Sequence, residues 1–166
     1  MTIDIHSTAI ISKDARIYPS QKKTIIRIGA YSEIYDFVVI KPVGGMGDIT
    51  IGEHCYINAH CTLYSGHGIT FGDYVLLAPG VVVAGSNHAY SSLECEIRKQ
   101  GFAPSKGGVV IENNVWIGAN SVILDGAYIE TGAVIAAGSV VRGRVGANEV
   151  WGGVPAKLIK RRLSND

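Results

Sequence analysis

Aliphatic residues return every six positions through the second half of the chain. They form the run Ile111, Ile117, Ile123, Ile129, Ile135 and Val141. Four positions after each lies a small or β-branched residue, namely Val115, Ser121, Ala127, Ala133, Ser139 and Val145. A period of six is neither the 3.6 of a helix nor the 2.0 of a single strand. It is typical of a chain that turns a corner every six residues, and it predicts a repeat solenoid.

Three such hexads make one coil, and stacked coils make a triangular prism with three parallel sheets. Each inward aliphatic should then stack on its equivalent 18 residues later, which gives the pairs Ile111–Ile129, Ile117–Ile135 and Ile123–Val141. Because these side chains fill the axis, such a prism has no deep internal pocket. Any functional site must lie on an outer face, against a loop, or between chains.

The same period runs through the first half of the chain with interruptions. Coils are predicted to begin at Ile5, Ile28, Ile51 and Phe71. Short insertions are predicted at 22–27 and 46–50, the latter following Gly44-Gly45, and a long excursion at 89–110. A loop of this length in a compact domain is usually functional. A C-terminal cap over 147–166 is expected to cover the last coil.

The composition fits one aliphatic domain that spans residues 1–166. Hydrophobic residues make up 47% of the chain but aromatic residues only 8%, so the core must consist of many thin aliphatic layers. Lys and Arg number 15 against 14 Asp and Glu, a balance that gives no support for binding to nucleic acid or acidic membranes. Within the cap, 157–165 is predicted to form one or two short helical turns.

The cysteines indicate a reduced compartment. There are three, an odd number, and Cys55 and Cys61 lie six apart at small-residue positions of the repeat, as core residues would. The first residues lack the basic and apolar segments of a signal peptide, and no apolar run approaches the length of a membrane span. We therefore expect a cytoplasmic protein without integral membrane association.

Beyond the hexads, three motifs carry a family likeness. They are Asn114-Val115-Trp116-Ile117-Gly118, Ala136-Ala137-Gly138-Ser139-Val140-Val141 and Gly152-Gly153-Val154-Pro155-Ala156-Lys157. With them the chain resembles the hexapeptide-repeat acetyltransferases, best the sugar O-acetyltransferase branch of galactoside, maltose and capsule or O-antigen acetyltransferases. The likeness covers nearly the whole chain. It implies an all-β fold, a left-handed parallel β-helix of about six coils, and a homotrimer with active sites in grooves between subunits. It also implies acetyl-CoA as the acetyl donor, with no metal requirement.

His88 is the leading catalytic candidate. It ends the fourth coil where the excursion begins, and the resemblance makes it the general base that takes a proton from the acceptor hydroxyl. Histidine is the side chain that most readily exchanges a proton near neutral pH. Asn58 matches the first asparagine of an Asn-Phe-Asn run that, in galactoside-type members, lies across the interface and orients the acceptor or the oxyanion. Here that run reads Asn58-Ala59-His60.

The resemblance also implies a path for coenzyme A. Trp116, Ala119 and Ala137 lie where the family lays the pantetheine arm along the prism, and small side chains there leave backbone amides accessible. The phosphates of coenzyme A require cations. Candidates near the C-terminus are Arg142, Lys157 and Lys160, in a cluster that continues through Arg161 and Arg162. Arg142-Gly143 stands where the family has a Thr-Lys pair.

The acceptor side is predicted to involve His60, Tyr90 and Arg98. The family's acidic residues that follow the asparagine run are here replaced by Ser65-Gly66, so the acceptor need not be a galactoside. The predicted reaction is transfer of acetyl from acetyl-CoA to a hydroxyl of a saccharide, a nucleotide sugar or a surface polysaccharide precursor.

Three other functions remain open at this point. N-acetylation of an amino-sugar nucleotide needs the same base. A γ-type carbonic anhydrase on the same fold would need three histidines around zinc, and the spacings of His54, His60, His67 and His88 do not match that pattern. A non-catalytic β-helix scaffold would not need an Asn-His pair beside a long loop.

Overall fold

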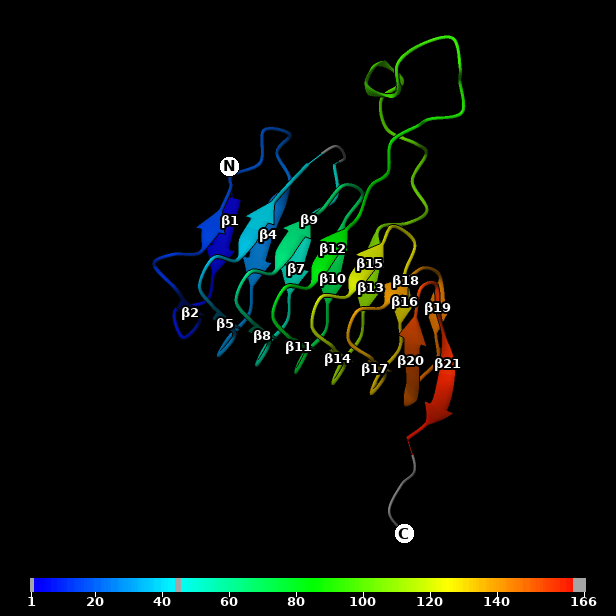
Figure 1. Ribbon diagram of the computed structural model, residues 1–166. Helices are drawn as coiled ribbons and strands as arrows, with labels where there is room; N and C mark the ends of the chain where they lie inside the picture. The colour runs from blue at the N-terminus through cyan, green and yellow to red at the C-terminus, as the bar shows by residue number, and fades with distance from the viewer. Residues whose placement is uncertain (1, 44–45, 163–166) are drawn as a thin grey trace.

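A computed structural model describes residues 2–43 and 46–162, which wind into a triangular prism (Figure 1). Gly44, Gly45 and residues 163–166, which belong to a predicted insertion flank and to the predicted cap, lie outside the described residues. Three sheets, here called A, B and C, form the three faces. Each coil contributes one strand to each face, so the predicted all-β prism is confirmed.

Sheets A and C contain only parallel strands. Sheet A consists of β1 (Thr2–Ile5), β4 (Ile25–Ile28), β7 (Ile49–Ile51), β10 (Ile69–Phe71), β13 (Val109–Ile111), β16 (Tyr128–Ile129) and β19 (Arg144–Val145). Sheet C consists of β3 (Arg16–Ile17), β6 (Val39–Lys41), β9 (Thr62–Tyr64), β12 (Val82–Ala84), β15 (Val122–Leu124) and β18 (Val140–Val141). The coils from β1 through β18 correspond to the six that were expected.

Sheet B also contains the last two strands of the described residues. It consists of β2 (Ile10–Ile11), β5 (Glu33–Ile34), β8 (Tyr56–Ile57), β11 (Leu76–Leu77), β14 (Trp116–Ile117), β17 (Val134–Ile135), β20 (Glu149–Gly153) and β21 (Ala156–Arg161). In the described residues the one helical element is η1 (Ile97–Lys99), a short 3₁₀ turn in the excursion. No helix there is long and apolar enough to cross a membrane.

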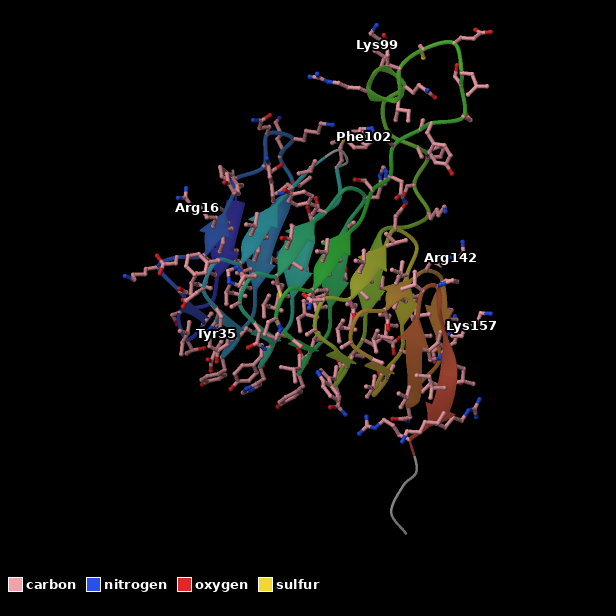
Figure 2. The ribbon with its side chains drawn as sticks, viewed as in Figure 1. Arg16, Tyr35, Lys99, Phe102, Arg142 and Lys157 are labelled. Carbon is pink, nitrogen blue, oxygen red and sulfur yellow. The ribbon has the colours of Figure 1, made fainter. Side chains whose placement is uncertain are left out.

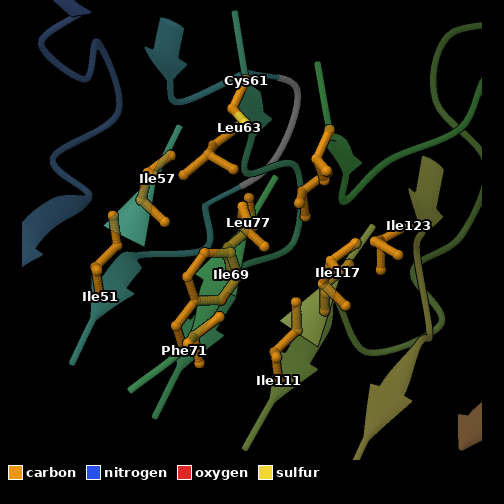
Figure 3. Close-up of a cluster of buried hydrophobic side chains, with 14 of the residues drawn as sticks. Ile51, Ile57, Cys61, Leu63, Ile69, Phe71, Leu77, Ile111, Ile117 and Ile123 are labelled. Atoms are coloured by element: carbon orange, nitrogen blue, oxygen red, sulfur yellow. The ribbon is translucent and has the colours of Figure 1, made fainter. Parts of the chain in front are cut away.

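The core is a column of stacked aliphatic side chains (Figure 3). All three predicted stacking pairs are confirmed by the strand register, which joins Ile111 to Ile129, Ile117 to Ile135 and Ile123 to Val141. The first member of each pair is fully buried. Burial of such a side chain is worth about 1.5–3 kcal/mol. The stacked layers therefore hold each coil in a fixed register with the next.

The predicted insertion bounds were wrong at their C-terminal ends. Residues 25–27, 49–50 and 109–110 belong to strands of sheet A rather than to loops. In these strands two residues point inward, as in Ile26 and Ile28, because side chains alternate along a strand. The six-residue period had identified only the second inward residue of each strand, such as Ile28. The excursion therefore ends before Val109, which pairs with Ile69 and is buried.

The two corners that flank sheet C differ in regularity. At the corner between sheets B and C, here called the BC edge, most coils place one residue in the left-handed region: Phe37, His60, Gly80, Asn120 and Gly138, with φ from 57° to 74°. All three insertions leave the prism at the opposite corner, between sheets C and A, here called the CA edge (Figure 1).

The C-terminal cap is a β-hairpin. The helical turns predicted for 157–165 are wrong over the described part, because β21 pairs antiparallel with β20 from Glu149–Arg161 to Gly153–Ala156. Without β21, the outer edge of β20 would present unpaired backbone groups. The Glu149 carboxylate accepts from Trp151 Nε1 at 2.8 Å and from Arg161 Nη2 at 3.2 Å. These bonds lower the pKa of the Glu149 carboxyl, the Trp151 bond most.

Candidate active site

His88 stands at the root of the excursion with an exposed ring. Its Nδ1 lies 3.0 Å from the carbonyl oxygen of Gly101, and its ring stacks on Phe102 with 4.9 Å between centroids. A carbonyl oxygen can only accept a hydrogen bond, so Nδ1 carries the proton. The lone pair of Nε2 is consequently left to act as the base.

A short antiparallel contact fixes this ring. Ala89 N donates to Gly101 O at 3.0 Å, Ala103 N donates to Asn87 O at 2.8 Å, and His88 bridges to Phe102 between them. We call residues 87–89 and 101–103 the neck. Both the backbone of His88 and the acceptor of its Nδ1 belong to the neck. The orientation of the imidazole therefore depends on how the neck sits on the prism.

Beyond the neck the excursion projects away from the prism (Figures 1 and 2). Its tip is organised by the side chain of Gln100, which donates to the carbonyls of Ser92 and Cys95 at 2.9 and 3.0 Å. The predicted acceptor residues Tyr90 and Arg98 are both exposed here. Leu93 at the tip is 100% exposed, so the tip presents apolar as well as charged side chains to its surroundings.

Asn58 and His60 lie on the BC edge, directly after β8. The Asn58 amide nitrogen donates to Leu77 O at 2.8 Å, which uses one of its two protons and holds the side chain against the next coil. His60 adopts a φ of 62° and stacks on Phe37 with 5.1 Å between ring centroids. Both predicted residues therefore lie on the regular edge rather than beside the excursion.

Ala119 and Ala137 occupy the same edge, two and three coils further on. Gly138 N donates to Ala119 O at 2.8 Å, so consecutive corners are stacked through their backbones. At Gly118 a Cβ atom would lie only 2.5 Å from Ala137 N, which leaves no room for a side chain. The result is a track of small residues at Ala119 and Ala137 on the BC edge.

Trp116 and Lys160 line one groove on sheet B. The groove has a volume of about 520 Å³ and is also lined by Val134, Val150, Arg161 and Arg162. Its floor is apolar and one rim is cationic, because β21 lies beside β20. Lys157 is on the same strand but outside this lining, and Arg142 follows β18 at the CA edge (Figure 2).

The predicted site residues thus fall into two groups at opposite ends of the sheet C strands. The BC group comprises Asn58, His60, Ala119 and Ala137, with Trp116 on the adjoining face. The CA group comprises His88, Tyr90, Arg98 and Arg142. Asn58 precedes β9, while His88 follows β12, the parallel neighbour of β9. One chain alone does not bring these two residues together.

Two buried polar atoms under the excursion have no hydrogen-bond partner among the described residues: Ser65 Oγ and His67 Nε2. They flank Gly66, which is packed so tightly on Gly85 and Ser86 that an added Cβ would lie 2.2–2.5 Å from their atoms. Buried polar groups are almost always paired. The exception lies at the coil directly below the start of the excursion.

Sequence reasoning missed Phe102 and the Gly101 carbonyl, which hold the His88 ring. The six-residue period gives no signal inside the excursion, and a backbone acceptor has no sequence signature. The one available hint was the length of the loop, which can fold back on its own root. Among the described residues, no three His, Cys, Asp or Glu side chains are grouped so that they could hold a metal ion.

Known protein families share the repeat of this chain. The family model described as bacterial transferase hexapeptide (six repeats) matches residues 108–143, and that described as hexapeptide repeat of succinyl-transferase matches 48–84. Galactoside O-acetyltransferase of Lactococcus lactis is 32% identical over 152 residues, which are 89% of this chain and 70% of that protein. The chain belongs to the hexapeptide-repeat acyltransferases, in the branch of the sugar O-acetyltransferases. Its left-handed β-helix is the fold of that family.

Two further matches are an O-acetyltransferase and an N-acyltransferase. Galactoside O-acetyltransferase of Escherichia coli K12 is 38% identical over 119 residues, or 72% of this chain, but the match spans only 57% of that enzyme. Among solved structures, a Bacillus cereus N-acyltransferase, AntD, in complex with dTDP-4-amino-4,6-dideoxyglucose and coenzyme A, superposes with a TM-score of 0.81. It is 29% identical, and the superposition covers 98% of this chain and 84% of AntD.

Proposed function

We propose that this hexapeptide-repeat protein transfers an acetyl group from acetyl-CoA to a hydroxyl of a saccharide, with His88 as the general base. The observation that carries the proposal is the bond between His88 Nδ1 and Gly101 O. In the neutral imidazole this bond assigns the proton to Nδ1, so the lone pair of Nε2 is the one available to a base. The cytoplasmic location stays a prediction.

The reaction needs no covalent enzyme intermediate. Nε2 takes the proton of the acceptor hydroxyl while the hydroxyl oxygen bonds to the thioester carbonyl carbon. The carbonyl oxygen becomes an oxyanion, the C–S bond then breaks, and the imidazolium returns its proton to the departing thiolate. The products are an acetyl ester and coenzyme A. The two buried cysteines fit this direct route, since burial raises the pKa of the Cys61 thiol to about 11 and also raises that of Cys55.

Asn58 is the proposed donor to the oxyanion. Its amide keeps one N–H after bonding to Leu77 O, and an oriented amide donor contributes strongly to acyl transfer. Because Asn58 and His88 lie at opposite ends of sheet C, this role requires a second copy of the chain. We therefore propose that the CA edge of one subunit faces the BC edge of the next, closing into the trimer expected from the family resemblance.

Acetyl-CoA fits the residues on the BC side. The groove beside Trp116 offers an apolar floor for the adenine ring and, from Lys160 to Arg162, cations for the phosphates. The pantetheine arm would then follow the track of small residues at Ala119 and Ala137, as the family resemblance implies. Arg142 and Lys157 are kept as secondary phosphate candidates, and His60, Tyr90 and Arg98 as acceptor candidates.

A mixing experiment tests both the roles and the shared site. His88→Ala and Asn58→Ala are each expected to be inactive as homo-oligomers. If the site combines His88 of one subunit with Asn58 of its neighbour, subunit exchange between the variants creates some intact sites. Coenzyme A release with a saccharide panel should then return to a fraction of the wild-type rate. Two active homo-oligomers would overturn the assignment, and two inactive variants without recovery would overturn the shared site.

A second candidate is N-acetylation of an amino-sugar nucleotide. It is favoured by the superposition on the Bacillus cereus N-acyltransferase, whose described complex contains such a nucleotide sugar. The base, the donor and the oxyanion contact would be the same. Parallel assays with matched hydroxyl and amino sugars, free and nucleotide-linked, separate the two candidates, because the preferred acceptor gives the larger kcat/KM.

A further inference from the structure

Asp125 is a buried carboxylate that the proposed reaction does not use. It follows β15 at the CA edge and is only 4% exposed. Its Oδ2 accepts a hydrogen bond from Lys106 N, and its Oδ1 accepts one from Gly108 N, both at 2.9 Å. Burial of a carboxylate is costly unless its oxygens are bonded. Here both oxygens are used on a single short segment of chain.

That segment is the returning limb of the excursion. Gly126, next to Asp125, donates from its N to Gly108 O at 2.6 Å, so Gly108 is bonded through both its N–H and its carbonyl. A Cβ at Gly126 would lie 2.7 Å from the Lys106 Cβ, which indicates close contact. Asp125 and Gly126 together form a clamp where the excursion rejoins the prism.

The clamp lies only two residues from the neck. Between Ala103 and Lys106 the chain has only Pro104 and Ser105. Proline fixes its own φ, and the Ser105 hydroxyl accepts from Gly107 N at 2.9 Å. Because this link is short and restricted, a shift of Lys106 should also shift Ala103 and the neck. The limb held by Asp125 therefore sets the position of residues 101–103, which include the acceptor of His88 Nδ1.

We propose that Asp125 is a positioning residue for His88, acting through Lys106–Gly108 and the neck. The proposal rests on the proposed function of His88 as the base. Asp125 itself touches neither substrate nor the reacting atoms. Its bonds fix Lys106–Gly108, which continue the same stretch of chain as Gly101. The Gly101 carbonyl in turn fixes the His88 ring and its tautomer. Loss of the clamp should leave the ring present but poorly oriented.

The test compares Asp125→Ala with Asp73→Ala. The Asp73 carboxylate also accepts a backbone N–H from another coil, Glu53 N at 2.8 Å, but at the corner between sheets A and B, away from the excursion. Ring-nitrogen NMR on the protein alone reports the His88 tautomer, and amide exchange at Ala89 and Ala103 reports the neck. For Asp125→Ala we expect loss of the Nδ1–H preference and at least tenfold faster neck exchange.

Activity adds a second readout. Misplacement of a catalytic group by about 1 Å can cost roughly a hundredfold, so we expect kcat of Asp125→Ala to fall about tenfold or more with KM for acetyl-CoA within twofold. Asp125→Asn, which keeps one acceptor oxygen, should lie between wild type and Asp125→Ala, and it replaces Asp125→Ala in every comparison if the latter does not fold.

Unchanged ring signals and neck exchange would overturn the proposal, and so would equal changes in Asp73→Ala. These measurements need no substrate. They therefore distinguish failure of the clamp from failure of the proposed function, which is decided by the activity of His88→Ala.

Discussion

The two edges of sheet C obey different rules within one fold. At the BC edge each coil passes to the next face through a short corner, and Gly80, Asn120 and Gly138 repeat the same left-handed conformation. At the CA edge three of the corners are replaced by insertions, and the longest of these carries His88. The same inward aliphatics stack below both edges.

The difference shows that one edge of a repeat fold can stay regular while the other edge carries the insertions in which a candidate catalytic residue lies. A regular edge can offer only a repeated feature, such as the track of small residues at Ala119 and Ala137. A side-chain arrangement that occurs only once needs a segment that does not follow the six-residue repeat, such as the neck that holds His88. Placing all insertions at one edge leaves the other edge free of insertions.

The largest expected effect comes from the unique side of the comparison. His88→Ala should lower turnover at least a hundredfold, because removal of a general base typically costs 10²–10⁴-fold. The fold should persist, since the ring is exposed and its contacts lie within the neck. Thiol release from acetyl-CoA in the presence of acceptor, with circular dichroism as the control for folding, measures this. Normal turnover by the variant would remove His88 from the reaction.

Paired insertions test the regular side directly. A Gly-Ser insertion between Ala119 and Asn120 should break the stacked bonds from Gly138 N to Ala119 O and from Asn120 N to Pro79 O. At about 1 kcal/mol per bond, plus disturbed packing, we expect a loss of at least ~2 kcal/mol in the free energy of unfolding. The same insertion between Ser91 and Ser92 lengthens a loop and should cost under ~1 kcal/mol. Denaturant unfolding compares the two, and equal losses would mean that the edges do not differ mechanically.

The sequence revealed the regular edge far better than the irregular one. Hexads report which side chains point inward, so the stacking of Ile117 on Ile135 could be read from spacing alone. They do not report where a strand begins. Residues 109–110 were assigned to the loop because parallel pairing with β10, rather than the period, makes them a strand.

The site was predictable only as far as side chains mark it. His88 was proposed from its place before a long loop, and Asn58 from the family likeness. The Gly101 carbonyl and the Asp125 clamp depend on how the excursion folds back, which no local pattern encodes. The cap was misassigned for a related reason. Residues 157–161 become a strand because β20 presents an open edge, a tertiary effect that overrides local preference.

A smaller effect is expected in the groove on sheet B. Trp116→Ala removes the aromatic part of its floor, so KM for acetyl-CoA should rise about tenfold while kcat changes little, as expected when binding is lost equally from ground and transition states. Leu76→Ala is the matched control, since Leu76 pairs with Trp116 in the sheet but lies outside the groove lining. Initial-rate kinetics against acetyl-CoA measures both. Equal KM changes in the two variants would argue against a nucleotide in this groove.

The smallest expected effect concerns the cysteines. Their labelling rates compare the stacked coils with the excursion. Cys55 and Cys61 are buried within the coils, while Cys95 is exposed in the excursion. Burial raises the pKa of the Cys61 thiol to about 11 and also raises that of Cys55, so neither forms a thiolate at neutral pH. A maleimide should therefore label one thiol in the native protein and three after denaturation. Because the proposed reaction uses no cysteine, Cys95→Ser should keep turnover within about twofold, the range of ordinary surface substitutions. Rapid labelling of two or three thiols would show that the coils open as readily as the excursion, and the contrast between the two edges would fail.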